Sequence, residues 1–311
     1  MTFSAKLAAK SAAVLAIGAL ALTACTNASE TGGAGQPGGT ESAAAFDPSA
    51  VKKDDTLAAA VPDSIKSKGK ILVGSDTSYA PAEFLGGSDG QTPMGYDVDI
   101  AKAIGAKLGL EAEVQTAEFT GILPALGPKY DLGISSFTIN PERLKAVNFV
   151  SYFEAGTSWA VQKGNPKGFS LDDVCGKKVG VQTGTVQEEE DLTARNKECK
   201  DAGKPAIEVV SLKTQTDINT RLVNGSVDAM LADSPIIGYA ITQTNGAVEK
   251  IGEPYDSAVQ GIAVAKKDTE FAELIQKTLT SLMEDGTYEQ ILKAWGNEDG
   301  AISKAELNPA V

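Results

Sequence analysis

The chain has 311 residues, 42% of them hydrophobic, which is enough to build about two domains with substantial cores. It carries 41 acidic and 28 basic side chains and no histidine, so its formal net charge at pH 7 is -13. This charge argues against nucleic acid or an anionic lipid surface as the main partner, because both attract basic surfaces.

Residues 1–24 have the pattern of a signal peptide. Lys6 and Lys10 precede an apolar run, Ser11 to Leu22, that is too short to span a bilayer. The small residues of LTAC then lead to Cys25 and resemble a bacterial lipobox, which implies cleavage before Cys25 and acylation of that cysteine. We therefore expect an extracytoplasmic lipoprotein anchored to the cell membrane. An ordinary secretory signal with a chance cysteine is the alternative.

A tether is expected after the lipid anchor. From Thr26 to about Ala50 the sequence consists of Gly, Ser, Thr, Ala and Pro with almost no large apolar residue. This composition is typical of a flexible linker, and we place its full extent at residues 25–60.

Two cysteines remain if Cys25 is acylated. An exported chain most simply pairs Cys175 with Cys199 in a disulfide. The bridge would close a loop of about 25 residues and stabilise the fold by roughly 3 kcal/mol on the chain-entropy model. A C-x23-C spacing without histidine matches no zinc or redox motif, so we expect no metal and no cofactor.

Short apolar runs alternate with amphipathic segments from Lys70 onward, which is typical of an α/β sheet. The first half of this region is predicted to contain strands at 70–75, 111–116 and 130–135 and helices at 96–108 and 120–126. The second half repeats that order with strands at 177–182, 207–212 and 227–232 and helices at 185–195 and 217–223. We therefore predict two similar α/β lobes.

Two extended runs are predicted to connect these lobes. The first is 151–164 and the second is 260–267, which is followed by helices at 268–284 and 287–295. Two crossing strands make a natural hinge, and the last helices are expected to return to the first lobe. The prediction is thus lobe one at 61–155 plus 260–311, lobe two at 156–259, and a ligand cleft between them.

Residues that follow the strands are the candidate site, because ligands bind beyond the carboxyl ends of strands in open α/β sheets. An arginine there can hold a carboxylate with two parallel hydrogen bonds, and amides at helix starts add donors. An aspartate on the other lobe can accept from an ammonium group, and aromatic rings can flank what lies between. These parts suit an α-amino acid. The candidates are Asp76, Tyr79, Phe119, Ser135, Ser136, Thr138 and Arg143 of lobe one and Thr185, Val186 and Asp233 of lobe two.

Each candidate also has a purely structural explanation. Thr138 and Asp233 could cap the helices that follow them, although Asn140-Pro141 and Ser234-Pro235 are better placed to do so. Arg143 could be a solvated residue beside a carboxylate, and the two aromatic rings could belong to the core. The combination, more than any single residue, favours an amino acid site.

Seven sequence runs make a family resemblance specific. The chain resembles the polar amino acid branch of the bacterial extracellular solute-binding proteins, family 3, which supply ABC importers. The runs follow the family's order over about residues 65–297. They are VGSDTSYAPAEF, GYDVDIAKAIGAKLGL, GILPAL, KYDLGISSFTINPER, GKKVGVQTGTVQE, VNGSVDAMLADSP and DGTYEQILKAWG.

The resemblance implies a periplasmic-binding-protein-like α/β fold whose two lobes close around an amino acid. It implies that Arg143 binds the α-carboxylate of the substrate. The expected helpers of this arginine are Thr138 and the backbone amides of Thr185 and Val186. The implied partners are a free amino acid, the permease and ATPase of an ABC transporter, and the membrane through the lipid anchor.

The remaining roles also come from the resemblance. Asp233, together with Ser136, is expected to bind the α-ammonium group. Tyr79 and Phe119 are expected to flank the substrate side chain. Asp76 would face its far end, which favours a polar or cationic amino acid.

Two departures from the family pattern affect the expected pocket. Pro81-Ala82-Glu83 stands where the family often has Pro-Phe-Glu, so one aromatic wall is lost. Val186 stands where the family often has threonine, so only its backbone amide is available there.

Three alternatives remain. The first is an enzyme on the same fold, similar to a cyclohexadienyl dehydratase, although the acidic run QEEEDL at 187–192 more simply complements a helix dipole. The second is a calcium loop in the tail WGNEDGAISKAEL, which lacks a ligating residue at its first position, Trp295. The third is a structural or adhesive role without any small-molecule ligand.

Overall fold

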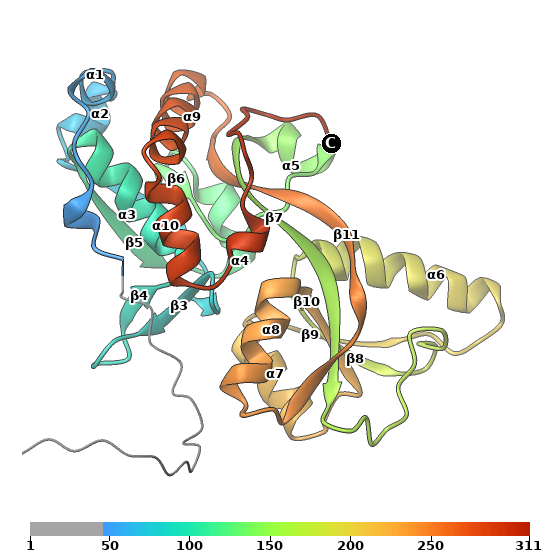
Figure 1. Cartoon of the computed structure of the whole chain (residues 1–311). Helices are drawn as coiled ribbons and strands as arrows, with labels where there is room; N and C mark the ends of the chain where they lie inside the picture. The colour runs from blue at the N-terminus through green and yellow to red at the C-terminus, as the bar shows by residue number, and fades with distance from the viewer. Residues whose placement is uncertain (1–45) are drawn as a thin grey trace, which may run out of the picture. The chain divides into compact units, whose positions relative to one another are not determined.

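The computed structural model describes residues 46–311 (Figure 1). The predicted signal peptide, the predicted lipidation site Cys25 and the predicted tether as far as residue 45 lie outside this range. Within it, no helix combines the length and the apolar character that a membrane crossing requires.

One eight-stranded sheet runs through both lobes in the order β5-β1-β6-β11-β7-β10-β8-β9, and its two ends are built alike. At one end β1 pairs in parallel with β5 and β6, and at the other β8 pairs in parallel with β9 and β10. The predicted α/β architecture is confirmed. The strands are β1 (Lys70–Ser75), β5 (Glu111–Thr116), β6 (Leu132–Gly133), β7 (Val147–Gln162), β8 (Lys178–Gln182), β9 (Glu208–Leu212), β10 (Ala229–Asp233) and β11 (Val248–Ala265).

The two long strands β7 and β11 connect the ends of this sheet and pair antiparallel along their length (Figure 1). Both are longer than predicted, because each continues through both lobes. β6 pairs with β11 on one side, and β10 pairs antiparallel with β7 on the other. The ladder between β7 and β11 shifts register near Ile251, Tyr255 and Gln260, so pairing is least regular midway between the lobes.

Helices cover the sheet in both lobes. α3 (Tyr96–Leu108) has the predicted bounds, and α9 (Thr269–Glu284) and α10 (Thr287–Ala294) pack against it, so the last helices return to lobe one as predicted. In lobe two, α7 (Gln215–Val223) and α8 (Ser234–Gln243) contact β10. The other helices are α1 (Asp55–Ala59), α2 (Asp63–Lys66), α4 (Phe119–Ile122), α5 (Pro141–Ala146) and α6 (Thr193–Asp201), which continues the π-helical segment η3 (Gln187–Leu192).

Residues 46–60 belong to the folded body, so the predicted extent of the tether, to residue 60, is wrong. The Asp54 carboxylate accepts hydrogen bonds from two amides of the first turn and starts α1. Phe46, Val51 and Leu57 lie partly buried against the hydrophobic core. These few apolar residues are widely spaced, which is why composition alone did not reveal the packing.

Several local predictions need correction. The third strand of lobe one covers only Leu132–Gly133 of the predicted 130–135, and it stops where the side chains that follow turn toward buried carboxylates. The helix predicted at 120–126 is α4 followed by a 3-10 turn, η2 (Leu123–Ala125), because Pro124 cannot donate a helical hydrogen bond. The small antiparallel sheet of β2 (Ser78–Tyr79), β3 (Glu83–Gly86) and β4 (Thr92–Met94) was not predicted.

The predicted disulfide is confirmed. Cys175 and Cys199 are bonded, with their Cα atoms 5.6 Å apart. The bridge joins the loop before β8 to α6, and Cys199 lies in the core of lobe two.

Candidate functional site

A pocket with about 290 Å³ of empty space, open solvent included, lies between the lobes, where the ends of β1, β6, β8 and β10 meet. All ten residues that the sequence predicts as ligand-binding line it. Its residues are Asp76, Tyr79, Glu83, Phe119, Ser135, Ser136, Thr138, Arg143, Gln182, Thr185, Val186, Gln187 and Asp233. Three of these, Glu83, Gln182 and Gln187, were missed as site residues, although each lies in or beside a motif that was recognised.

Arg143 supplies the positive charge of the pocket. It sits on α5, whose start is fixed by Asn140, which accepts a bond from the Arg143 amide at 2.9 Å. Its guanidinium donates to the carbonyl of Thr138 at 2.8 Å and to that of Gly184, in lobe two, at 3.0 Å. Burial lowers the pKa of Arg143, but guanidinium remains charged at neutral pH.

Aromatic rings complete the surroundings of this guanidinium. It lies over the rings of Phe119 and Phe137, 5.5 and 5.8 Å from their centroids. No carboxylate among residues 46–311 comes within 4.0 Å of it. The arginine therefore has unused donors and a charge without a close counter-ion in the described part of the chain.

Asp233 supplies a buried negative charge from lobe two. It occupies the N-cap position of α8, but its carboxylate makes no bond to that helix. Instead, Oδ1 accepts from Gln187 and Oδ2 from Gln260, each at 2.8 Å, while its amide donates to the hydroxyl of Tyr79 at 3.1 Å. Burial raises the pKa of Asp233 to about 6 although these bonds oppose the shift. A nearby cation would favour the ionised form.

Asp76 accepts four hydrogen bonds from the protein. Its Oδ1 accepts from the hydroxyl and amide of Ser78, at 2.6 and 3.2 Å. Its Oδ2 accepts from the amide of Phe119 at 3.0 Å and from Gln182, across the cleft, at 3.1 Å. A carboxylate offers about four such positions, so a ligand group could bond to Asp76 only by displacing one of these donors. Burial also raises the pKa of Asp76.

Glu83, which lines the pocket, and Asp97 form a second buried acidic group. Ser135 donates to Glu83 at 2.8 Å, and the amide of Ser136 donates to Asp97 at 2.9 Å. Burial and the neighbouring carboxylate raise the pKa of Glu83, and burial raises that of Asp97. Two adjacent buried carboxyl groups favour holding one shared proton. The serine hydroxyls therefore also serve this pair, since the Oγ of Ser136 lies 3.3 Å from Glu83.

The start of the helix in lobe two offers backbone donors to the pocket. Thr185 uses its hydroxyl to bond the carbonyl of Gln182 at 2.8 Å. Within residues 46–311, the amides of Thr185 and Val186 donate to no protein acceptor. Both amides precede η3, where the helix dipole favours an anion.

Contacts across the cleft hold the two lobes together in this structure. Lys213 of lobe two lies 2.8 Å from Glu118 of lobe one, and Asn140 donates to Glu190 at 2.8 Å. Together with the Asp76–Gln182 and Arg143–Gly184 bonds, these contacts define a closed arrangement around the pocket.

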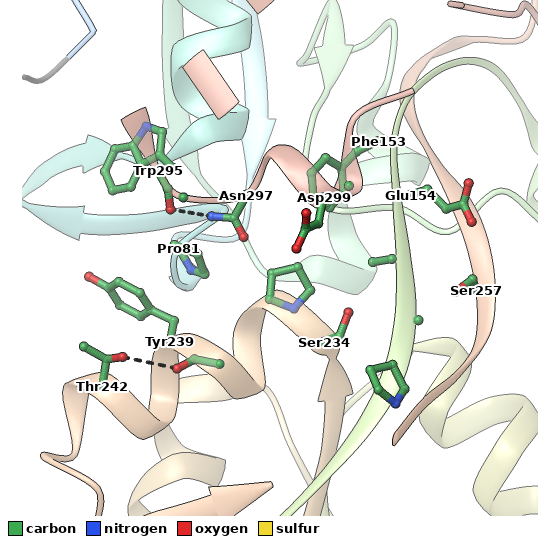
Figure 2. A pocket seen from close by; sticks show the side chains of 17 residues that line it. Pro81, Phe153, Glu154, Ser234, Tyr239, Thr242, Ser257, Trp295, Asn297 and Asp299 are labelled. Atoms are coloured by element: carbon green, nitrogen blue, oxygen red, sulfur yellow. Dashed lines mark hydrogen bonds between the residues drawn. The ribbon is translucent and has the colours of Figure 1, made fainter. Parts of the chain in front are cut away.

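A second hollow is larger but chemically different. It holds about 1230 Å³ of empty space, open solvent included, beside the hinge strands, α8 and the chain after α10. Figure 2 shows Tyr239 of α8 below Pro81 and Trp295, with Glu154 and Asp299 at other parts of its wall. Both carboxylates are exposed, and no residue predicted as ligand-binding lines this hollow. The smaller pocket, which concentrates buried charge, is therefore the candidate site.

A family model identifies the chain. It describes the bacterial extracellular solute-binding proteins, family 3, and matches residues 71–298. The chain belongs to this family. The matched range contains all ten predicted site residues and leaves residues 1–70 and 299–311 outside it.

Curated relatives are similar over most of their length. The arginine-binding protein ArgT of Corynebacterium glutamicum is 31% identical over 253 residues, covering 81% of this chain and 82% of that protein. The glutamine-binding protein GlnH of Bacillus subtilis is 33% identical over 255 residues, covering 80% and 87%. Both relatives are named as proteins that bind an amino acid.

Solved structures of this family share the two-lobed fold. An ancestral arginine-binding protein bound to arginine superposes with a TM-score of 0.66 at 37% identity, covering 73% of this chain and 98% of that one. A variant of ArgBP from T. maritima gives a TM-score of 0.66 at 34% identity, covering 76% and 99%. The predicted fold is confirmed by these similarities.

Proposed function

We propose that this protein is the substrate-binding component of an ABC importer and that it captures a cationic amino acid, with arginine as the first candidate. The observation that carries the proposal is the placement of Arg143 and Asp233 in one closed pocket, from different lobes and without a salt bridge between them. The α-carboxylate would bind Arg143 and the amides of Thr185 and Val186. The α-ammonium would bind Asp233.

Charge balance supports a cationic side chain. Against the single positive charge of Arg143, the pocket sets Asp76, Asp233 and the Glu83–Asp97 pair. With one proton on that pair, two negative charges remain in excess. A neutral zwitterion leaves this excess unchanged, whereas a cationic amino acid reduces it, and burial makes uncompensated charge costly. Tyr79 and Phe119 would flank the aliphatic part of the side chain.

The names of relatives support the same choice. Proteins that bind arginine occur among the relatives and among the solved structures, at 31% and 37% identity. The glutamine-binding relative makes glutamine the second candidate. Other relatives are named for cystine and histidine, so the charge balance of the pocket is needed to favour arginine.

Hinge closure would couple binding to transport. The two lobes, divided near residues 155/156 and 259/260, would rotate about β7 and β11, and the amino acid would favour the closed state by contacting both lobes. A permease would then recognise the closed form. The lipobox-like sequence before Cys25 supports the further proposal that the mature protein is a lipoprotein on the outer face of the cell membrane.

The test is a thermal-shift screen of the twenty amino acids, followed by calorimetry of those that bind. Ligand at about 1,000 times its Kd stabilises a protein by about 4 kcal/mol, which corresponds to a rise in Tm on the order of 10 °C for a protein of this size. We expect arginine to give the largest rise. A response to glutamine alone would keep the binding role and correct the substrate, and no response to any amino acid would refute the proposal.

The enzyme alternative predicts a different result in the same samples. A binding protein leaves its amino acid unchanged after prolonged incubation, as chromatography can establish. A solved relative is described as an ancestral amino acid-binding protein and a precursor of cyclohexadienyl dehydratase, at 30% identity and a TM-score of 0.63. Turnover of an amino acid or of a prephenate-like acid would therefore favour the enzyme.

A further inference from the structure

Gln260 lies on the hinge strand β11, at the boundary where the ladder with β7 shifts register. Its side chain is buried, with 1% of the residue exposed. It is absent from the lining of the pocket and from the seven sequence runs that carry the family resemblance. Its position nevertheless connects the two halves of the proposed site, the half around Arg143 that would bind the α-carboxylate and the half around Asp233 that would bind the α-ammonium group.

The main chain of Gln260 is fixed to lobe one. A short bridge pairs Gln260 with Thr138, and the flanking bonds run from the Ile139 amide to Val259 at 2.9 Å and from the Gly261 amide to Phe137 at 2.8 Å. Thr138 is also the residue whose carbonyl accepts from Arg143. The backbone at Gln260 is therefore held next to the carboxylate-binding half of the site.

The side chain of Gln260 reaches the other half. Its Nε2 donates to Oδ2 of Asp233 at 2.8 Å, and this is the only hydrogen bond that the amide makes within residues 46–311. Its Oε1 is buried and has no protein partner there. The unpaired buried oxygen costs free energy, and the amide is oriented by a single contact, to Asp233.

We propose that Gln260 is a positioning residue that orients the Asp233 carboxylate and keeps it ionised for the substrate ammonium, so that the hinge strand takes part in ligand recognition. The inference rests on the proposed function, in which Asp233 binds that ammonium. The ionisable groups that face Asp233 are Tyr79, whose hydroxyl accepts from its amide, and Arg143, which lies close enough to favour its ionised form. Tyr96 is a third neighbour whose own ionisation Asp233 opposes.

The test replaces Gln260 by methionine, which keeps the length of the side chain and removes the donor. Losing a donor to an ionised carboxylate raises its pKa. We expect the pKa of Asp233 to rise by about one unit in this variant, which is a tenfold change in its protonation equilibrium. The pKa would be measured from the 13Cγ signal of Asp233 in the ligand-free protein. Affinity for L-arginine should then fall about tenfold at pH 5.5 but much less at pH 8.5.

Gln215→Met is a matched control. Gln215 is also 1% exposed and also has an unpaired buried Oε1, but its Nε2 donates to Asn219 at 3.0 Å instead of to a pocket carboxylate. This variant should lose thermal stability without moving the Asp233 titration. If Gln260→Met does not fold, Gln260→Leu removes the same donor and carries the same expectation.

The outcomes separate this inference from the proposed function. An unchanged Asp233 titration in the Gln260 variant, or an affinity loss by the same factor at both pH values, would overturn the positioning role. Because the titration is read without ligand, it tests the effect on ionisation even if L-arginine fails to bind. Failure of the unaltered protein to bind any amino acid would instead refute the proposed function.

Discussion

Replacing Arg143 by alanine is expected to remove most of the affinity for the amino acid. The guanidinium already uses two of its five N–H donors on the carbonyls of Thr138 and Gly184, which leaves a fork of donors for the substrate carboxylate. In the variant that carboxylate would be buried beside two backbone amides without a counter-charge.

The magnitude follows from these bonds. A hydrogen bond to a charged group contributes about 1.5 to 3 kcal/mol, so two parallel bonds contribute about 3 to 6 kcal/mol. Taking about 4 kcal/mol as a central value, Kd should increase roughly a thousandfold. Arg143→Lys should recover only part of this loss, because an ammonium cannot hold both carbonyls and a bidentate carboxylate with its three donors.

Calorimetry with L-arginine measures the change, and Lys145→Ala provides the control. Lys145 lies on the same helix, its side chain is 70% exposed, and its ion pair is with Glu142, outside the pocket. The Lys145→Ala protein should bind L-arginine with the same affinity as the unaltered protein. An Arg143→Ala protein that folds and binds within about threefold of the unaltered protein would refute the assignment of this arginine.

Two further predictions concern pH and the disulfide. Burial raises the pKa of Asp233 to about 6, and a bound ammonium group favours the ionised carboxylate, so affinity for the amino acid should rise as pH increases from 5 to 7. Calorimetry in buffers of different ionisation enthalpy should show that binding releases protons, and Asp233→Asn should bind weakly and without this release. An affinity of the unaltered protein that does not change with pH would contradict the role of Asp233. Replacing both Cys175 and Cys199 by serine should lower the free energy of unfolding, measured by denaturant titration, by roughly 3 kcal/mol. The Kd for the amino acid should stay within about twofold of that of the unaltered protein. A large loss of affinity would contradict this prediction and show that the disulfide shapes the pocket.

The direction of the stability change for Asp233 also follows from its pKa. A carboxyl group whose pKa is raised in the folded state favours folding most at pH values below its unfolded pKa, near 3.8, and this contribution is lost as pH rises through about 6. The ligand-free protein should therefore gain stability from Asp233→Asn above pH 6, although the same change weakens binding. Function and stability oppose each other at this residue.

Sequence patterns located the regular elements better than the irregular ones. The strands at 70–75 and 111–116 and the helix at 96–108 have the predicted bounds, because apolar periodicity is strong there. The sheet containing β3 was missed, since its strands are two to four residues long and their pairing depends on contacts that periodicity does not encode. Glu83 was missed as a site residue for the same reason.

In the candidate site, too, the sequence predicted some features and not others. All ten residues predicted at strand ends line one pocket, because strand topology fixes where those ends meet. The partners of Asp76 were not predictable: its four donors come from the start of β2, a helix start and the other lobe. Gln260 was also invisible, because a glutamine in an extended run gives no signal until the fold brings it to Asp233.

The division of the site between lobes explains how a small ligand could drive closure. A ligand shifts a conformational equilibrium only by the difference in its affinity for the two states. If Arg143 and Asp233 were on one lobe, the zwitterion would bind both equally well in the open and closed forms. Because they come from different lobes, both charges can be satisfied at once only after closure. In the proposed mechanism, the ligand therefore favours the closed state, because only there does it supply a counter-charge to both residues.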